Sequence, residues 1–278
     1  MSAGHNRLEP WIAADEPPPF ELVNASGRGR AVLACDHASP RIPRQLGTLG
    51  VSPQDLEQHI AWDIGAAAVA RGLSEILDSP LVLSGYSRLV VDCNRPLDQP
   101  TAFATLSEDV EIPGNQQLSD EERAARAEAF FWPYHEALHH LVDSRVRSDG
   151  WPVLISIHSF TPVYQGQERP WHIGIQYRWD SRLAGLVLEG LRSDSALCVG
   201  DNEPYAVQLD EDYTVPVHAE RRGMPYLLVE IRQDLIASEA GARAWADRVS
   251  NAVSSAVAHP SLDHFMTPAP DVCEPRFE

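Results

Sequence analysis

The chain has 278 residues, with 22 basic and 40 acidic side chains and a formal net charge of −18. This acidic balance argues against nucleic acids and anionic membranes as main partners, although a local basic pocket could still bind a small anion. Hydrophobic content of 44% is typical of a globular protein, and no apolar run approaches the ~20 residues that a membrane span needs. The N-terminus has no basic stretch followed by an apolar one, so we expect a cytoplasmic protein.

The four cysteines lie far apart, at Cys35, Cys93, Cys198 and Cys273. Because they form no C-x-x-C pair, the pattern indicates neither a zinc knuckle nor a disulfide framework. Cys35 and Cys93 lie within apolar runs, so we expect them to be small buried hydrophobic residues.

Strand-like and helix-like segments alternate along the chain. Short apolar runs predict strands at about 30–35, 81–85, 152–158, 171–177 and 225–232. Longer stretches predict helices at about 55–77, 119–147, 180–193 and 237–258. This alternation predicts an α/β fold: a single three-layer domain over residues 30–258, with a mixed, mostly parallel central sheet and helices on both faces. An N-terminal arm (1–29) and a C-terminal tail (259–278) complete the chain.

Local signals refine two of these segments. The arm contains three consecutive prolines and is expected to be irregular. Ser119 and Glu122 form a capping-box pattern at the start of the helix over 119–147. Pro133 is expected to kink or divide that helix, because proline cannot donate the backbone hydrogen bond of a helix interior.

Two histidines, His37 and His158, stand at the ends of apolar strand-like runs. In open α/β sheets, chemistry collects where strands end. Neutral imidazole is a good zinc ligand, and a catalytic zinc takes three protein ligands and an open water position. A single histidine of this kind could merely form a hydrogen bond near the surface, but two at matching strand ends favour a metal site. The sequence has no H-E-x-x-H helix.

A third ligand must come from elsewhere, because Pro40 occupies the position where an H-x-x-E pattern would place a carboxylate. Asp63 is the candidate, at a predicted helix start beside Trp62. The alternative is that Asp63 only complements the helix dipole as a first-turn acid.

Glu230 lies within the apolar run Leu-Leu-Val-Glu-Ile. A glutamate in such a strand is costly to bury unpaired. Either it pairs with an arginine, such as Arg232 or Arg221, or it acts as a general base whose pKa burial raises.

A cluster of cationic and amide side chains, Arg88, Asn94 and Arg95, suggests a site for a substrate carboxylate, which guanidinium groups bind with two hydrogen bonds. The alternative is an internal salt bridge, for example between Asp92 and Arg95. Among the other histidines, His218 could support the site or stabilise an oxyanion. Four further histidines are expected to be solvated on helices: His59, His135, His139 and His140.

Together these segments resemble the N-formylglutamate amidohydrolase family, in family order over about residues 30–258. The matching segments are Cys35–Ser39, Ala61–Ala66, Ser87–Pro96, Ser156–Phe160 and His218–Leu235. The family is itself distantly similar to zinc carboxypeptidases. By that analogy, His37 and His158 hold one zinc ion and Glu230 is the base. The place of Asp63 as third ligand is our inference, since Pro40 departs from the pattern.

The resemblance implies hydrolysis of the C–N amide bond of an N-formyl or N-acyl amino acid, such as N-formyl-L-glutamate. Arg88 would help to stabilise the oxyanion, while Asn94 and Arg95 would hold a substrate carboxylate. A loop over 201–213 could close the pocket, with Tyr213 as a hydrogen-bond donor. His218 and Arg232 complete the expected substrate-binding residues.

Two rival functions remain open at this point. The first is a non-catalytic module that binds a carboxylate-bearing small molecule on the same fold. The second is a metal-independent amidase with Ser39 or Ser159 as nucleophile, although the sequence has no G-x-S-x-G motif. Apart from a small carboxylate substrate, the sequence indicates no partner.

Overall fold

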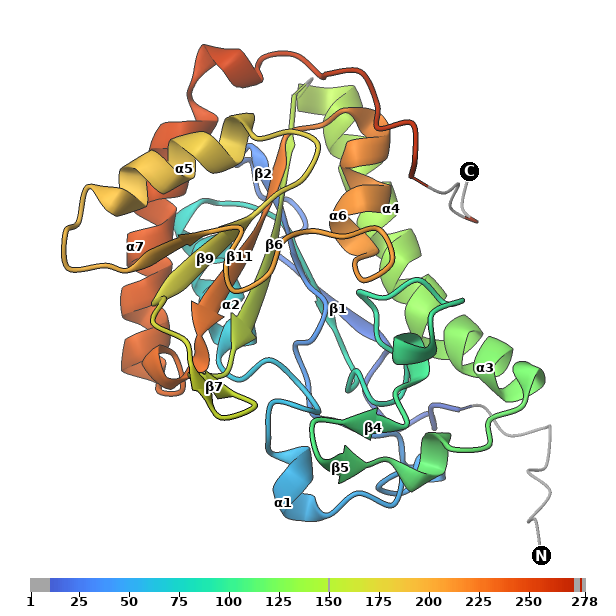
Figure 1. Ribbon diagram of the computed structural model, residues 1–278. Coiled ribbons are helices and arrows are strands. Elements are labelled where there is room, and N and C mark those ends of the chain that lie inside the picture. Colours follow the sequence, from blue (N-terminus) through green and yellow to red (C-terminus); the bar gives the residue numbers. More distant parts are fainter. Residues whose placement is uncertain (1–10, 150, 273–275, 277–278) are drawn as a thin grey trace, which may run out of the picture.

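The computed structural model describes residues 11–149, 151–272 and 276 (Figure 1). A seven-stranded sheet with the order β1-β3-β2-β6-β11-β9-β10 forms its centre. Its strands are β1 (Phe20–Val23), β2 (Ala31–Cys35), β3 (Leu81–Ser84), β6 (Val153–Phe160), β9 (Ile173–Gln176), β10 (Val199–Asp201) and β11 (Tyr226–Arg232). Among the described strand pairs of this sheet, β1–β3 and β9–β11 are antiparallel and the other four are parallel. The predicted mixed, mostly parallel sheet is confirmed.

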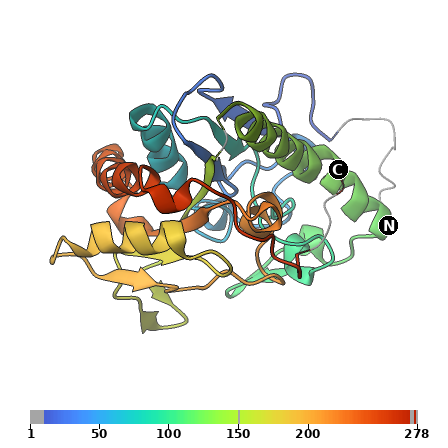
Figure 2. The same cartoon turned by 90° about the horizontal axis from the view of Figure 1, so that it is seen from above.

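Helices cover both faces of this sheet, as predicted. One face packs against α2 (Ala66–Ile76), α5 (Arg182–Arg192) and α7 (Glu239–Val257). The other packs against α4 (Trp132–Asp149) and α6 (Thr214–His218). Figure 2 shows α7 and α4 on opposite sides of the strands.

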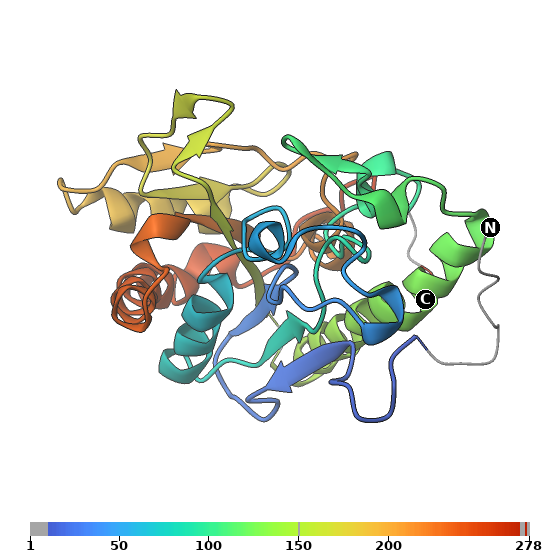
Figure 3. The same ribbon diagram turned by 90° about the horizontal axis from the view of Figure 1, so that it is seen from below.

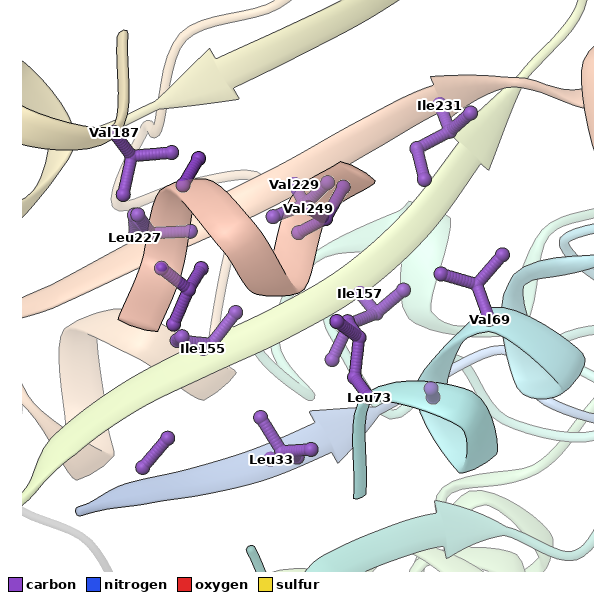
Figure 4. Packing of buried hydrophobic residues seen from close by; sticks show 14 of the residues in the cluster. Leu33, Val69, Leu73, Ile155, Ile157, Val187, Leu227, Val229, Ile231 and Val249 are labelled. Carbon is purple, nitrogen blue, oxygen red and sulfur yellow. The ribbon is translucent and has the colours of Figure 1, made fainter. Parts of the chain in front are cut away.

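The strands divide their side chains between these two faces by parity, because successive residues of a strand point to opposite sides. Odd-numbered residues of the central strands, such as Leu33, Ile157 and Val229, pack with Leu73 and Val249 of the helices (Figure 4). Even-numbered residues face α4 and α6, and toward the carboxyl ends they become polar. The polar ends of several strands therefore share one face and one edge of the sheet.

The connections gather around this edge. Two short hairpins lie there, β4 (Leu106–Ser107) with β5 (Val110–Glu111), and β7 (Val163–Tyr164) with β8 (Gln167–Glu168). Seen from below, they and α1 (Pro53–Leu56) surround the carboxyl ends of the central strands (Figure 3). Short 3-10 helices complete the structure: η1 (Arg44–Leu46), η2 (Pro100–Phe103), η3 (Pro113–Asn115), η5 (Glu220–Arg222), η6 (Gln233–Leu235) and η7 (Pro260–Leu262).

Two expectations about individual segments are corrected. The arm is not wholly irregular, because β1 adds an edge strand to the sheet at residues 20–23. The predicted helix over 55–77 is divided, since α1 ends at Leu56 and α2 begins only at Ala66. Gly65, the residue before α2, has a φ of 82°, a left-handed conformation that favours glycine. Asp63 therefore lies in a loop and not on a helix.

The helix predicted over 119–147 is present, with both hydrogen bonds of the capping box between Ser119 and Glu122. It runs as α3 (Asp120–Arg126), a π-helical segment (Ala127–Phe131) and α4. The change in helical geometry falls just before Pro133, where the sequence predicts an interruption. Cys35 and Cys93 are buried as expected, whereas Cys273 lies outside the described residues. Within the described chain, no helix is long and apolar enough to cross a bilayer.

Two glycines in adjacent strands allow a loop to pack closely on the sheet. Gly174 of β9 and Gly200 of β10 are neighbours in register. A Cβ atom at Gly174 would lie 1.8 Å from the Glu203 carbonyl oxygen, and one at Gly200 would lie 2.5 Å from it. The absence of side chains at both positions lets the loop after β10 lie directly on the sheet.

We expect the Gly174→Ala variant to lose roughly 1–3 kcal/mol of unfolding free energy, because the new methyl group collides with backbone. Gly185→Ala is the matched control, since a Cβ in this exposed position of α5 meets no atom within 4 Å. It should gain up to about 1 kcal/mol from helix propensity. Urea unfolding of both variants measures the difference, and equal stability would show that the loop does not depend on the glycine.

Candidate active site

A cavity of about 390 Å³ opens at the carboxyl ends of the central strands. It contains side chains from β6, β9 and β11 and from the loops that follow β2, β3, β6 and β10. Its lining residues are His37, His59, Asp63, Arg88, Asn94, Arg95, His158, Ser159, Tyr164, Gln176, Tyr205, Ala206, Glu211, Asp212, Leu228 and Glu230.

Three buried residues in this cavity form a candidate metal centre. His37 follows β2, His158 lies in β6, and Asp63 lies in the loop before α2. One potential ligand atom from each lies within 4.8 Å of the others. Asp63 Oδ2 is 2.8 Å from His158 Nδ1 and 3.4 Å from His37 Nδ1. The structure thus brings together the three residues chosen from the sequence.

The far nitrogen of each imidazole is fixed by another carboxylate. His37 Nε2 lies 2.6 Å from Asp92 Oδ1, and His158 Nε2 lies 3.0 Å from Asp36 Oδ2. Asp36 also accepts hydrogen bonds from three hydroxyl groups, those of Tyr134, Ser156 and Thr214. Carboxylates in this position orient metal-binding histidines and raise their basicity. Both Nδ1 atoms consequently face Asp63.

The hydrogen bonds and charges of this network stabilise a protonated histidine beside an ionised carboxylate, although both groups are buried. Burial by itself would lower the pKa of His158, but hydrogen bonds and charge from Asp36 and Asp63 raise it well above its usual value. Burial would raise the pKa of Asp63, but the charge of His37 and hydrogen bonds from both histidines lower it well below its usual value. Positive charge at this point is therefore strongly stabilised.

The donor set fits a divalent cation. Asp63 Oδ1 is buried and forms no hydrogen bond with any described residue. Arg88 Nη1 lies 3.6 Å from this oxygen, and His59 Nδ1 lies 3.8 Å from it. Two imidazole nitrogens and a carboxylate with an unsatisfied oxygen are the ligands that zinc takes in catalytic sites.

Glu230 stands beside this centre because β11 pairs with β6 in a register that sets Glu230 opposite His158. Its side chain lines the cavity with the residue 8% exposed, and its Oε2 atom forms no hydrogen bond with the described chain. Burial, with smaller contributions from Asp63 and Asp212, raises its pKa to about 8. Glu230 pairs with neither arginine considered for it, and Arg232 binds Asp234 instead.

The cationic cluster is arranged differently from the expected salt bridge. Arg88, and not Arg95, pairs with Asp92, at 2.7 Å. Arg95 donates to the carbonyl oxygens of Asn94 and Glu211. It forms no ion pair with a carboxylate in the described part of the chain. Arg95 thus lines the cavity and is available to bind an anionic group.

Asn94 holds the neighbouring loop through its side-chain amide. Its Nδ2 donates to Asp212 Oδ1 at 2.8 Å, and its Oδ1 accepts from the backbone N–H groups of Tyr213 and Thr214. The predicted loop over 201–213 therefore does form part of the cavity.

Three residues expected at the substrate site do not line the cavity. Tyr213 packs against Phe131 and His135, on the side of α4. His218 Nε2 lies 3.0 Å from His135 Nδ1, because α6 turns His218 toward α4. Arg232 lies beyond the cavity at the end of β11.

Sequence reasoning missed several residues that do line or support the site. His59 is a cavity residue and not a solvated one, and burial lowers its pKa to about 4. Its spacing of four from Asp63 was an available signal. Tyr205 and Gln176 gave no signal, because loop packing and strand register decide their places. His135 and His139 are also buried, contrary to expectation.

Comparisons with known sequences and structures show which proteins this chain resembles. The sequence profile described as N-formylglutamate amidohydrolase matches residues 29–237, a range that includes every residue lining the cavity. The gene product Atu2144 from Agrobacterium tumefaciens is 40% identical, with a TM-score of 0.86, over 89% of this chain and 98% of that one. An N-formylglutamate amidohydrolase from Ralstonia eutropha JMP134 is 19% identical, with a TM-score of 0.58, over 87% and 98%. A comparison with curated proteins gives no match.

We expect the metal-free Glu230→Gln variant to be more stable than the metal-free parent at about pH 8, with the advantage shrinking toward pH 5. The folded pKa of about 8 exceeds the ordinary 4.5. Between these values the unfolded chain releases the proton that the folded chain keeps, so the parent loses stability as pH rises. Glutamine has no such proton, and the gain at pH 8 should be roughly 2–5 kcal/mol.

Urea unfolding with chelator present, at several pH values, measures this difference. The same pH dependence in both proteins would contradict a buried, protonated Glu230.

Proposed function

Because this chain belongs to the N-formylglutamate amidohydrolase family and is a hydrolase acting on an amide bond, we propose that it is a zinc-dependent amidohydrolase of N-formyl or N-acyl amino acids. N-formyl-L-glutamate is the first candidate substrate. One observation carries the proposal: the β6–β11 register sets a buried carboxyl group, Glu230, beside a cluster of two imidazoles and a carboxylate.

His37, Asp63 and His158 would hold one zinc ion. When bound, zinc supplies a water molecule with its pKa lowered toward ~7 and a positive charge beside the substrate carbonyl. Asp36 and Asp92 keep both imidazole rings in the orientation that such a site needs.

Glu230 is assigned the role of general base and then acid. Its carboxylate accepts a proton from the attacking water and passes the proton to the leaving nitrogen as the amide bond breaks. A carboxyl group whose pKa burial has raised toward neutrality can both take and return a proton near neutral pH. Its unsatisfied Oε2 atom is available for this transfer.

The cationic residues have separate tasks. Arg95 would bind the substrate carboxylate, since its guanidinium lines the cavity without a carboxylate partner among the described residues. Asn94 would support this site by fixing Asp212 and the following backbone. Arg88, held by Asp92, would stabilise negative charge that develops on the carbonyl oxygen.

The two rival functions fit the site less well. In a module that only binds carboxylates, an ionised Glu230 would repel the ligand and would have no role in binding. For a serine nucleophile, Ser159 lacks a base, because its hydroxyl donates to the Ile64 carbonyl and both nitrogens of His158 face carboxylates. Ser39 does not line the cavity.

We expect protein purified without a histidine tag to contain about one zinc ion per chain and to release formate from N-formyl-L-glutamate. Chelator should abolish the release, and added zinc should restore it. Elemental analysis and a formate assay measure the two quantities. A chain that binds no metal under any loading condition would refute the metal centre, whereas bound zinc without turnover would refute the substrate.

The Glu230→Gln variant should keep its zinc and its KM but lose roughly 10²–10⁴-fold in kcat, the usual contribution of a general base. Steady-state kinetics on zinc-loaded protein measures the loss. Glu189→Gln, an exposed position of α5, is the matched control and should keep full activity. A kcat within a few-fold of the parent would remove Glu230 from the mechanism.

A further inference from the structure

Two tyrosines form a half-exposed aromatic wall of the cavity. Tyr164 is 38% exposed and Tyr205 is 40% exposed, and both line the cavity. Tyr164 belongs to the β7–β8 hairpin, whereas Tyr205 lies in the loop after β10. Neither residue has a role in the function proposed above. Because water is a poor neighbour for apolar ring surface, a ligand group that covers these rings would be bound favourably.

Arg169 holds the two rings, although they come from different loops. Its guanidinium carbon Cζ lies 4.6 Å from the ring centre of Tyr164 and 4.9 Å from that of Tyr205. Its Nη2 atom donates a hydrogen bond to Tyr205 Oη at 2.6 Å. These cation–π contacts and this hydrogen bond restrict the rings before a ligand arrives, so less conformational freedom is lost when a ligand binds to them.

The hairpin that carries Tyr164 is tightly closed. Tyr164 pairs with Gln167 across a two-residue turn, Gln165–Gly166, in which both residues have a positive φ. A turn of this kind matches the natural twist of a two-stranded hairpin. Successive residues of a strand point to opposite sides, so Val163 points away from the side of Tyr164. Val163 is 49% exposed and does not line the cavity.

Arg95, the proposed site for the substrate carboxylate, lies on the β2 side of the metal centre. It follows Asn94, whose backbone N–H donates to Asp92 Oδ1 at 2.8 Å, and the same oxygen contacts His37 Nε2. His37 follows β2, and the sheet order continues from β2 to β6 and then β11. A carboxylate bound by Arg95 therefore places the amino-acid half of the substrate on the β2 side.

The aromatic wall lies on the other side, beyond Glu230. The Arg169 carbonyl oxygen accepts a hydrogen bond from Arg232 Nη1, at the end of β11, at 3.5 Å. Tyr205 follows β10, at the far edge of the sheet, and Figure 1 shows β7 beside the ends of β9 and β11. Burial and the charge of Glu230 raise the pKa of Tyr205, as expected for a hydroxyl group near the base. With the amino acid on Arg95, the acyl group of the amide extends toward this wall.

We propose that Tyr164 and Tyr205 form a subsite for the acyl group of the substrate, and that this subsite prefers an aromatic acyl group, such as benzoyl, over formyl. The inference rests on the proposed function and deepens it by assigning the acyl half of the substrate. A formyl group carries only hydrogen beyond its carbonyl and leaves both rings uncovered. A benzoyl ring can stack on them. The cavity, at about 390 Å³, is within the range of roughly 300–1,000 Å³ that is typical of ligand pockets.

The reaction remains the hydrolysis of an amide. The C–N bond breaks, the hydroxyl group of water joins the acyl carbon, and its hydrogen joins the nitrogen. The products are an aromatic carboxylic acid and a free amino acid, so no oxidant, reductant or further reactant is needed.

The test varies the acyl group alone. Calorimetry on zinc-loaded Glu230→Gln protein compares N-benzoyl-L-glutamate with N-formyl-L-glutamate, which share the same amino acid. We expect the benzoyl compound to bind roughly 10-fold more tightly. Adding Tyr164→Ala should reduce this preference to about 2-fold or less, whereas Tyr164→Phe, which keeps the ring, should retain it. In zinc-loaded protein with Glu230 intact, kcat/KM should follow the same order.

Two controls separate this effect from a general disturbance of the hairpin. Val163→Ala removes an exposed apolar side chain from the same strand but from the opposite side, so it should alter the affinity for neither compound. The melting temperatures of the variants at Val163 and Tyr164 should stay close to that of the parent, because exposed substitutions usually change stability little.

The outcomes distinguish the two proposals. Equal affinity for both compounds, or a benzoyl preference that survives Tyr164→Ala, would overturn the aromatic subsite and leave the amidohydrolase function intact. A preference that depends on the Tyr164 ring, without turnover of either compound by the zinc-loaded parent, would support the subsite and overturn the proposed reaction. Binding of neither compound would overturn both.

Discussion

The parallel pairing of β6 with β11 is the constraint on which the site depends. Its register sets Glu230 opposite His158, and the same alternation buries Ile157 and Val229 against the helices of the other face. A shift by one residue would turn the apolar residues into the cavity and the polar ones into the core. The hydrophobic packing that stabilises the sheet therefore also positions the chemical groups, with no separate device needed.

The buried charges oppose this stability. Four carboxyl groups, those of Asp36, Asp63, Asp92 and Glu230, lie close to the imidazoles of His37, His59 and His158. An ionised carboxylate would cost several kcal/mol if it were buried alone. Asp36 avoids that cost with three hydroxyl donors and His158, and Asp92 avoids it with Arg88 and His37. Glu230 is the exception, because burial raises its pKa to about 8. The network therefore separates a group that transfers protons from groups that keep a fixed charge.

The sequence predicts the site residues that lie on strands, but not those whose positions depend on how the loops pack. His158 and Glu230 could be identified because each is a polar residue in a short apolar run, where burial without a task is costly. Asp63 was chosen correctly for the cluster but placed on a helix, because the left-handed Gly65 was not recognised as a helix start. Tyr205 reaches the cavity only through tertiary packing of its loop. The burial of His135 could not be predicted, because polar and apolar residues alternate irregularly along α4 and do not show which side of the helix faces the sheet.

The division of each strand into two faces also has a consequence for how such a sequence can change over time. Positions on the helix-packed face, such as Ile155, need only fill volume, and several apolar residues of similar size can do so. Positions on the cavity face need particular atoms. Because adjacent residues serve these different demands, new substrate preferences can arise at one residue while stability is recovered at its immediate neighbour. Within a single strand, the residues that affect stability and those that affect substrate preference can therefore be replaced almost independently.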